Sequence, residues 1–143
     1  MLQPLCNNHF QVQWGGTRTG FMSVAGLSQA VEVLSFRDGS SPDSTPRLLP
    51  GQPSFAPVVL TRSIEPGDNE CFAWMKAVRF HLAERRDVSI SLLNADHEPV
   101  VTWRLRSAFP SKLEYGSLDA LGNAVATESL TLVHEGLSVE HTG

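Results

Sequence analysis

The stretch VVTWRLRSAFPSKL, residues 100–113, decides what kind of fold this chain can form. Trp103 and Leu105 fall on one side of an extended backbone, while Arg104 and Arg106 fall on the other side. This alternation predicts a half-buried strand with a cationic second face. The proline that follows has no backbone N–H to donate, so we expect the strand to bend there.

The rest of the chain repeats this strand pattern. Short runs of alternating or β-branched residues are separated by turns that are rich in glycine and proline. The runs predict strands at residues 10–14, 30–36, 58–63, 87–94, 99–109 and about 125–134, with residues 137–140 extending the last strand beyond a kink at Gly136.

One segment has the helical period instead. Its apolar residues recur at a spacing of three or four, which places them in a single stripe along a helix. The stripe consists of Cys71, Trp74, Met75, Val78 and Leu82. Asp68 is suited to cap the first turn. We therefore expect a helix over about residues 69–82, lying on one face of a sheet.

The order of these elements indicates the fold class. Strands that do not alternate with helices predict antiparallel sheets, in a barrel or a sandwich, with the helix packed against them. A chain of 143 residues is expected to form a single domain, residues 1–143, with its own hydrophobic core. The expected class is therefore mainly β with one helix.

Residues 38–57, DGSSPDSTPRLLPGQPSFAP, interrupt the strand pattern. The segment contains five prolines, and each removes a hydrogen-bond donor from the backbone. We therefore expect a long loop. Leu48, Leu49 and Phe55 argue against plain disorder, because a free linker has little use for apolar side chains. We expect the loop to dock on another surface.

Composition disfavours several classes of protein. The net charge of −4 argues against nucleic acid as the main partner. Cys6 and Cys71 are too few for a disulfide framework, so we interpret both as free thiols in a reducing cytoplasm. No secretory signal is visible at the N-terminus, and no run of about 18 apolar residues could span a bilayer. We expect synthesis in the cytoplasm and no direct membrane anchor.

The sequence contains no recognisable catalytic, cofactor or metal pattern. The five histidines form no H-E-x-x-H motif and lie near no cysteine pair with zinc spacing. Phe21 stands where a phosphate-binding loop requires lysine, and no G-x-S-x-G elbow occurs. Cys71 belongs to the apolar stripe of the helix, which favours a buried structural thiol over a nucleophile. We expect no enzyme activity, no cofactor and no metal.

Four segments resemble the tail tube family of contractile phages and contractile injection systems. They are GFMSVAGLSQAVEVLSFRDG (20–39), RLLPGQPSFAPVVLTRSI (47–64), VSISLLNADHEPVVTWRLRSAFPSKL (88–113) and NAVATESLTLVHEGLSVE (123–140). They cover most of the chain in the order of the family, with the helix that carries Trp74 in between. The tube protein of type VI secretion is a more distant resemblance.

The resemblance implies a small antiparallel β-barrel of two packed sheets, flanked by one α-helix, and a ring of six copies. Rings then stack into a hollow inner tube, which a sheath drives through a target membrane. The implied partners are other copies of the chain, the sheath protein, baseplate and spike proteins, and protein cargo in the lumen. DNA could pass through a phage tail, but no specific recognition of nucleic acid is expected. Such particles assemble in the cytoplasm and can be released from the cell.

Two sets of residues are candidates for contacts within this assembly. The expected ring-stacking loop carries Asp38, Gly39, Arg47, Leu48, Leu49 and Phe55. Arg104 and Arg106 are expected to face either the lumen or a neighbouring subunit. We prefer the subunit contact, because paired charges fix register without strong non-specific association.

Two alternatives stay open. A baseplate-proximal initiator or adaptor ring would have the same fold but would not polymerise. In its favour, Ser63 follows Arg62 where many relatives have glycine, and the N-terminal LQPLCNNHF is less typical of the family. A ligand-binding barrel or an enzyme would need a pocket with converging polar groups.

Overall fold

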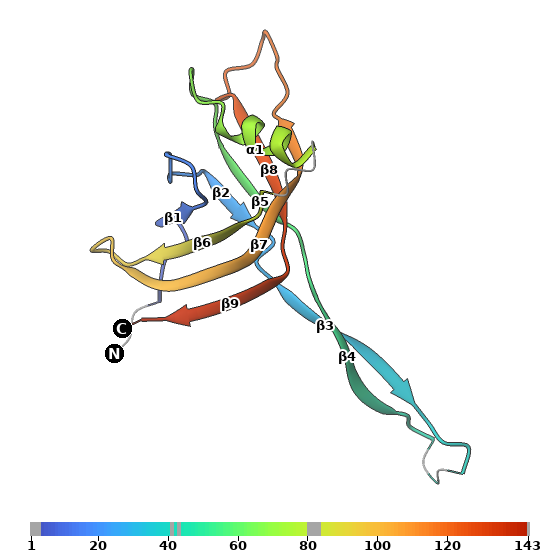
Figure 1. Cartoon of the computed structure of the whole chain (residues 1–143). Helices are drawn as coiled ribbons and strands as arrows, with labels where there is room; N and C mark the ends of the chain where they lie inside the picture. The colour runs from blue at the N-terminus through green and yellow to red at the C-terminus, as the bar shows by residue number, and fades with distance from the viewer. Residues whose placement is uncertain (1–3, 41, 43, 80–83, 143) are drawn as a thin grey trace.

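The computed structural model describes residues 4–40, 42, 44–79 and 84–142 of the chain. Within these residues, nine strands and one helix follow one another (Figure 1). The elements are β1 (Phe10–Gln13), β2 (Ser23–Ala25), β3 (Gln29–Phe36), β4 (Arg47–Phe55), β5 (Val58–Ser63), α1 (Glu70–Arg79), β6 (Arg86–Leu93), β7 (Pro99–Tyr115), β8 (Thr127–Val133) and β9 (Gly136–His141). The strand pairs are antiparallel, as the missing βαβ alternation predicts.

Strand β7 connects the two layers of the body. Its first part pairs with β6 and β9, and its second part pairs with β8. We call β1, β6, β9 and residues 99–106 of β7 the first layer. The second layer consists of β2, β5, β8 and residues 109–115 of β7. One strand crosses from layer to layer, so the sheet folds over on itself, and this confirms the predicted mainly β fold with two sheets.

The bend in β7 begins earlier than predicted. The predicted strand ends just before Pro110, whereas β7 continues to Tyr115. Ser107 has a left-handed backbone with a φ of 53°, and its N–H donates to Asp87 Oδ1 at 3.0 Å. The pairing changes from the first layer to the second around this serine. A bulge between Pro110 and Lys112 then bends the strand further.

The hydrophobic core fills the space between the two layers. Strand alternation sends every second side chain inward, and the ring of Trp14 lies 6.0 Å from the ring of Trp74. The core residues are Val12, Trp14, Val58, Leu60, Cys71, Trp74, Val88, Ile90, Leu105, Ala108, Leu130 and Leu132. Leu105 is fully buried, as the alternation around Trp103 predicts, while Arg104 and Arg106 are exposed.

Helix α1 contributes Cys71 and Trp74 to this core. The predicted cap is confirmed, because Asp68 Oδ1 accepts the backbone N–H of Glu70 at 3.2 Å. Met75 and Val78 are half-buried along the same stripe. The end of the predicted helix, including Leu82, lies outside the described residues.

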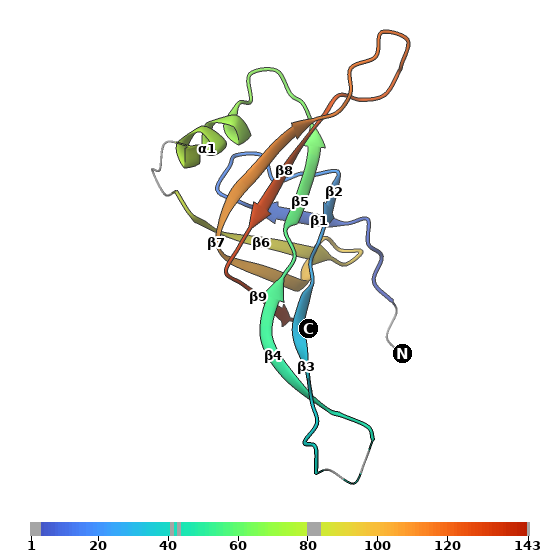
Figure 2. The same cartoon turned by 90° about the vertical axis from the view of Figure 1, so that its right-hand side faces the viewer.

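The predicted loop at residues 38–57 is wrong for much of its length, because residues 47–55 form strand β4. β4 pairs with β3 in a separate two-stranded hairpin, which projects from the body (Figures 1 and 2). Each strand of such a ribbon has one edge without a partner, and proline is tolerated along that edge. The register shifts between Val31 and Val33, because β4 has one extra residue between their partners, Pro53 and Pro50.

The hairpin joins the body at a close backbone approach. Gly26, between β2 and β3, has a φ of 95°, which favours glycine. A Cβ at this position would lie 2.2 Å from the carbonyl oxygen of Pro57, between β4 and β5. The two segments that join the hairpin to the body, β2–β3 and β4–β5, therefore lie in close backbone contact at Gly26 and Pro57. The short strand β2 next to it has only three residues, too few for its alternation to be recognised in the sequence.

Candidate functional site

The β3–β4 hairpin exposes apolar side chains along its length. Leu48 is 67% exposed and Val33 is 63% exposed. The other large apolar residues that the hairpin exposes are Val31, Leu34, Phe36 and Leu49. A patch of this kind indicates a surface that another molecule covers.

Both faces of the hairpin are apolar. Cross-strand partners share a face, and successive residues alternate between faces. Leu34 lies opposite Leu49 on one face. Val33 lies opposite Pro50, and Ser35 opposite Leu48, on the other face. A ribbon that is apolar on both sides needs partners on both sides before its apolar surface is removed from water.

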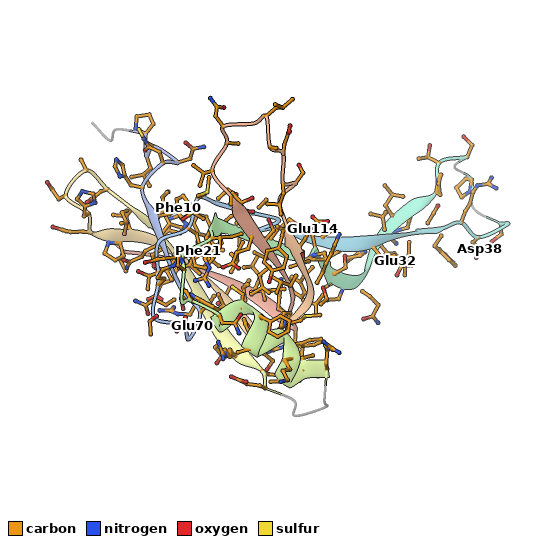
Figure 3. The ribbon with its side chains drawn as sticks, turned by 90° about the horizontal axis from the view of Figure 1, so that it is seen from above. Phe10, Phe21, Glu32, Asp38, Glu70 and Glu114 are labelled. Atoms are coloured by element: carbon orange, nitrogen blue, oxygen red, sulfur yellow. The ribbon has the colours of Figure 1, made fainter. Side chains whose placement is uncertain are left out.

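The tip of the hairpin is polar. Asp38 Oδ1 accepts hydrogen bonds from the backbone N–H and the hydroxyl of Ser40, both at 3.0 Å. These bonds stabilise the carboxylate and lower the pKa of Asp38, the backbone bond having the larger effect. Figure 3 places Asp38 at the far end of the hairpin, away from the body. Asp38 and Gly39 therefore lie at the tip, while Leu48 and Leu49 lie along β4.

A second projection stands at the opposite end of the molecule. The connection between β7 and β8, residues 116–126, forms a loop that rises from the body, with the hairpin at the other end (Figures 1 and 2). Within it, Leu121 is 97% exposed, Leu118 is 86% exposed, and Val125 is also exposed. Most of this segment lies between the predicted strands at residues 99–109 and about 125–134, and it was not predicted as a contact surface. The sequence signal that could have identified it as a contact surface is the occurrence of leucines in the stretch LDALGNA (118–124), which also contains turn-forming glycine and asparagine.

Arg104 and Arg106 lie on the outward face of the first layer, beside a groove of about 560 Å³. Phe55 and Pro53, from the base of the hairpin, line the same groove. The structure thus brings the two predicted arginines together with Phe55, one of the residues named for the predicted ring-stacking loop. Leu48, farther along the hairpin, does not line this groove.

The two arginines already have partners within the chain. Arg104 forms an ion pair with Glu140, its near neighbour on β9. Arg106 Nη2 donates to the backbone oxygen of Glu135 at 2.9 Å. Because both pairs are exposed, each contributes little to the free energy of unfolding. Both guanidinium groups lie at the rim of the groove.

A buried ionic cluster, which the sequence analysis missed, fixes the loops around the start of α1. Arg62 Nε donates to Glu128 Oε1 at 2.7 Å, and Arg62 Nη2 donates to Asp68 Oδ1 at 3.2 Å. Arg18 Nε lies 3.1 Å from the other carboxylate oxygen of Asp68. The guanidinium of Arg62 also lies 5.1 Å from the centre of a Trp14 ring. The sequence signal that could have identified this cluster is the alternation along β5, which places Arg62 on the inward face of the strand.

The glycine-rich segment 15–20 is a loop that the start of α1 holds in place. Glu70 accepts hydrogen bonds from the backbone N–H of Thr17 at 2.9 Å and from its hydroxyl at 3.0 Å. The carboxylate of Glu70 therefore ties this loop to the first turn of α1. The segment connects β1 with β2, and this contact gives it a structural role.

The chemistry of Cys71 agrees with a structural role. Burial raises the pKa of its thiol to about 12, so the thiol stays protonated near neutral pH. Among the described residues, no cluster of histidine, cysteine and carboxylate side chains could hold a metal ion. In the same part of the chain, no helix is both long and apolar enough to cross a membrane.

Comparisons with known proteins agree on one family. Residues 6–138 match the family described as T4-like virus tail tube protein gp19. No curated protein sequence matches significantly. A chain from the sheath–tube complex of an extracellular contractile injection system, PVC, is similar with a TM-score of 0.88 and 29% identity, over 97% of this chain and 93% of that chain.

Two further solved structures extend this comparison. A chain from the tube-terminating cap of the anti-feeding prophage has a TM-score of 0.89 and 28% identity, over 99% of this chain and 94% of that one. Hcp1 from Flavobacterium johnsoniae has a TM-score of 0.56 and 16% identity, over 93% of this chain and 95% of that one. This last likeness concerns the fold alone.

Proposed function

This chain belongs to the family of T4-like virus tail tube proteins, and from that premise we propose that six copies close into a ring and that rings stack into the hollow inner tube of a contractile particle. The structural role as a tube subunit follows from the family. The number of copies and the stacking contacts are our proposal. The observation that carries it is the pair of exposed apolar projections at opposite ends of the body.

Stacking joins these two projections. The hairpin of one ring, with Leu48 and Leu49, reaches the ring below, and the 116–126 loop, with Leu118 and Leu121, meets the ring above. Contacts between two different surfaces of identical copies can repeat without limit, which is what a tube requires. The two apolar faces of the hairpin allow it to contact one copy on each side.

The groove beside Arg104 and Arg106 is the proposed contact between copies within one ring. It combines an apolar lining from Pro53 and Phe55 with charged groups at its rim. Apolar burial supplies affinity, and the paired charges fix the register of the contact. This arrangement supports the subunit contact for the two arginines rather than exposure to the lumen.

The remaining partners follow from the particles in which the similar chains occur. One similar chain comes from a sheath–tube complex and another from a tube-terminating cap. By analogy, this tube is enclosed by a sheath, starts on a baseplate with a spike, and carries protein cargo in its lumen. Its action is mechanical, because contraction of the sheath drives the tube through a target membrane. Assembly takes place in the cytoplasm, within a phage tail or a related extracellular particle.

Native mass spectrometry of the purified protein tests the ring. The expected spectrum contains a species of six chains, with multiples of six at higher concentration. A spectrum with another closed ring size would contradict the proposed number of copies. Hexamers that never form multiples would identify the baseplate-proximal adaptor ring instead of the repeated subunit.

A further inference from the structure

The β3–β4 hairpin joins the body through its base. Among the described residues, neither β3 nor β4 pairs with a strand of the body. Two short connections, residues 26–28 and 56–57, link the hairpin to the body, and Gly26 has the left-handed φ of 95°. Farther along, β4 has a bulge between the partners of Val31 and Val33. A ribbon bends at such a bulge and turns at short terminal connections, so the hairpin can change direction while the sheet of the body stays intact.

One face of the hairpin already begins to cover the groove beside Arg104 and Arg106. Phe55 and Pro53 line that groove, and the ring of Phe55 lies 5.4 Å from the ring of His134 on the body. Cross-strand partners share a face, so this face continues along the hairpin away from the groove. Its further members are Gln29, Val31, Val33, Ser35, Leu48 and Pro50.

The two faces of the hairpin differ in charge. The face that begins at Phe55 carries no charged side chain among the described residues of β3 and β4. The opposite face carries Glu32, which Figure 3 labels along the hairpin, and Arg47 at the start of β4. The groove itself has an apolar lining from Leu105 and Leu137. An uncharged apolar face suits this lining, whereas the opposite face would remove charged groups from water.

The length of the hairpin matches the width of the groove. Ser89, Arg104 and Ser138 lie opposite one another in a row across β6, β7 and β9, and all line the groove. This row spans about 10 Å at the usual spacing of strands. Val33 lies about 13 Å farther along the hairpin than the level of Phe55, at the usual rise of a strand. In Figures 1 and 2 the hairpin points away from this row, but a hairpin turned over the groove would bring Val33 close to Ser89.

We propose that the unassembled chain folds its hairpin back over its own groove, and that the extended hairpin is the form that assembles. The inference rests on the proposed function, which assigns ring stacking to the hairpin and the contact within a ring to the groove. In the closed form one apolar face of the hairpin and the groove cover each other, and apolar burial favours this form in a free chain. Neighbouring copies in a tube cover the same surfaces and hold the hairpin extended. Free chains therefore start a tube slowly, whereas the end of a tube opens each chain that binds to it.

An engineered disulfide tests the closed form. Val33→Cys with Ser89→Cys places one thiol on the hairpin and one in the groove, in a Cys6→Ser background in which Cys71 stays buried. A disulfide needs Cα atoms within about 7 Å of each other, so it forms within one chain when the hairpin is closed. Leu34→Cys with Ser89→Cys is the matched control, because Leu34 lies on the opposite face of the hairpin. Each variant is oxidised as a dilute, unassembled chain, and its melting temperature shows that it is folded.

The variant with thiols at residues 33 and 89 is expected to form its disulfide within one chain, and much faster than the control. The oxidised chain should form no tubes, and reduction of the disulfide should restore their growth. Absence of the disulfide, equal rates in the two variants, or normal tube growth by the oxidised chain would overturn the closed form. Failure of the wild type to form tubes, with the disulfide formed as expected, would instead contradict the proposed function and leave the closed form standing.

Discussion

At the scale of single residues, the buried ion pair of Arg62 and Glu128 is a point where one substitution should reduce stability. Arg62 is 1% exposed and has Glu128 at 2.7 Å. Glu128→Gln keeps the shape but removes the charge, and it leaves a buried guanidinium that only Asp68 compensates. We expect the free energy of unfolding to fall by about 3 kcal/mol. Urea unfolding of dilute, unassembled protein measures this loss.

Glu135→Gln is the matched control for that change. Glu135 pairs with Arg85 at 3.1 Å, but both side chains are exposed. Its loss should change the free energy of unfolding by less than about 1 kcal/mol. Equal effects of the two substitutions would show that burial of the Arg62 pair does not matter for stability.

Cys71 makes the free energy of unfolding depend on pH in the alkaline range. Its pKa is raised to about 12 in the folded chain, from an ordinary value of 9.0. Between these values the unfolded chain has lost the thiol proton and the folded chain still holds it. Deprotonation therefore favours unfolding, and the contribution that is fully present below pH 9 is lost as the pH rises toward 12.

The melting temperature of the wild type and of Cys71→Ala, measured from pH 8 to pH 10.5, isolates this effect. Cys71→Ala should be less stable at pH 8, because it leaves a cavity beside Trp74. Its melting temperature should nevertheless fall less steeply above pH 9 than that of the wild type. Parallel curves would rule out a buried, protonated thiol.

At the scale of elements, we propose that the exposed apolar residues of the β3–β4 hairpin serve assembly rather than folding. Leu48→Ser with Leu49→Ser changes exposed positions outside the core, so the effect on the free energy of unfolding should stay within about 0.5 kcal/mol per site. Growth of tubes should be lost, because the stacking contact loses its apolar surface. Sedimentation of assembled material measures this.

The control is Leu48→Met with Leu49→Met, which keeps a similar apolar area at the same positions. This variant should sediment like the wild type. Normal growth of the serine variant would exclude these leucines from the stacking contact. Loss of folding in the serine variant would show that the hairpin belongs to the core of the domain.

The elements also show how far the sequence predicts this fold. The strand at Val58–Ser63 coincides with its prediction, because its alternation is regular and its inward side chains are buried. β4 was not predicted, because prolines exclude a central strand but not one strand of an isolated hairpin. The bend at Ser107 could not be predicted either. It depends on a hydrogen bond to Asp87, which is distant in the sequence.

The candidate surfaces were predicted only in part. Leu48 and Leu49 stood out because apolar residues are unusual in a proline-rich segment. Phe55 lines a groove together with Arg104 and Arg106. This proximity depends on the course of the hairpin relative to β7, which cannot be predicted from sequence patterns. The exposure of Leu121 likewise depends on how residues 116–126 leave the body.

At the scale of the whole molecule, we propose that folding and assembly use separate surfaces. The core, the buried Arg62 cluster and α1 hold one body together. The hairpin and the 116–126 loop extend from its two ends and carry apolar side chains that the single chain leaves in water (Figure 1). A subunit built in this way can fold before it assembles, and in the proposed tube each new ring would present the same two surfaces to the next.

Negative-stain electron microscopy across a concentration series tests the tube most directly. The account predicts hollow tubes of one uniform width, whose length increases with protein concentration while the width stays constant. Constant width follows from a closed ring, and increasing length follows from a stacking contact that never closes. Single chains at every concentration, or filaments without a central channel, would contradict the account.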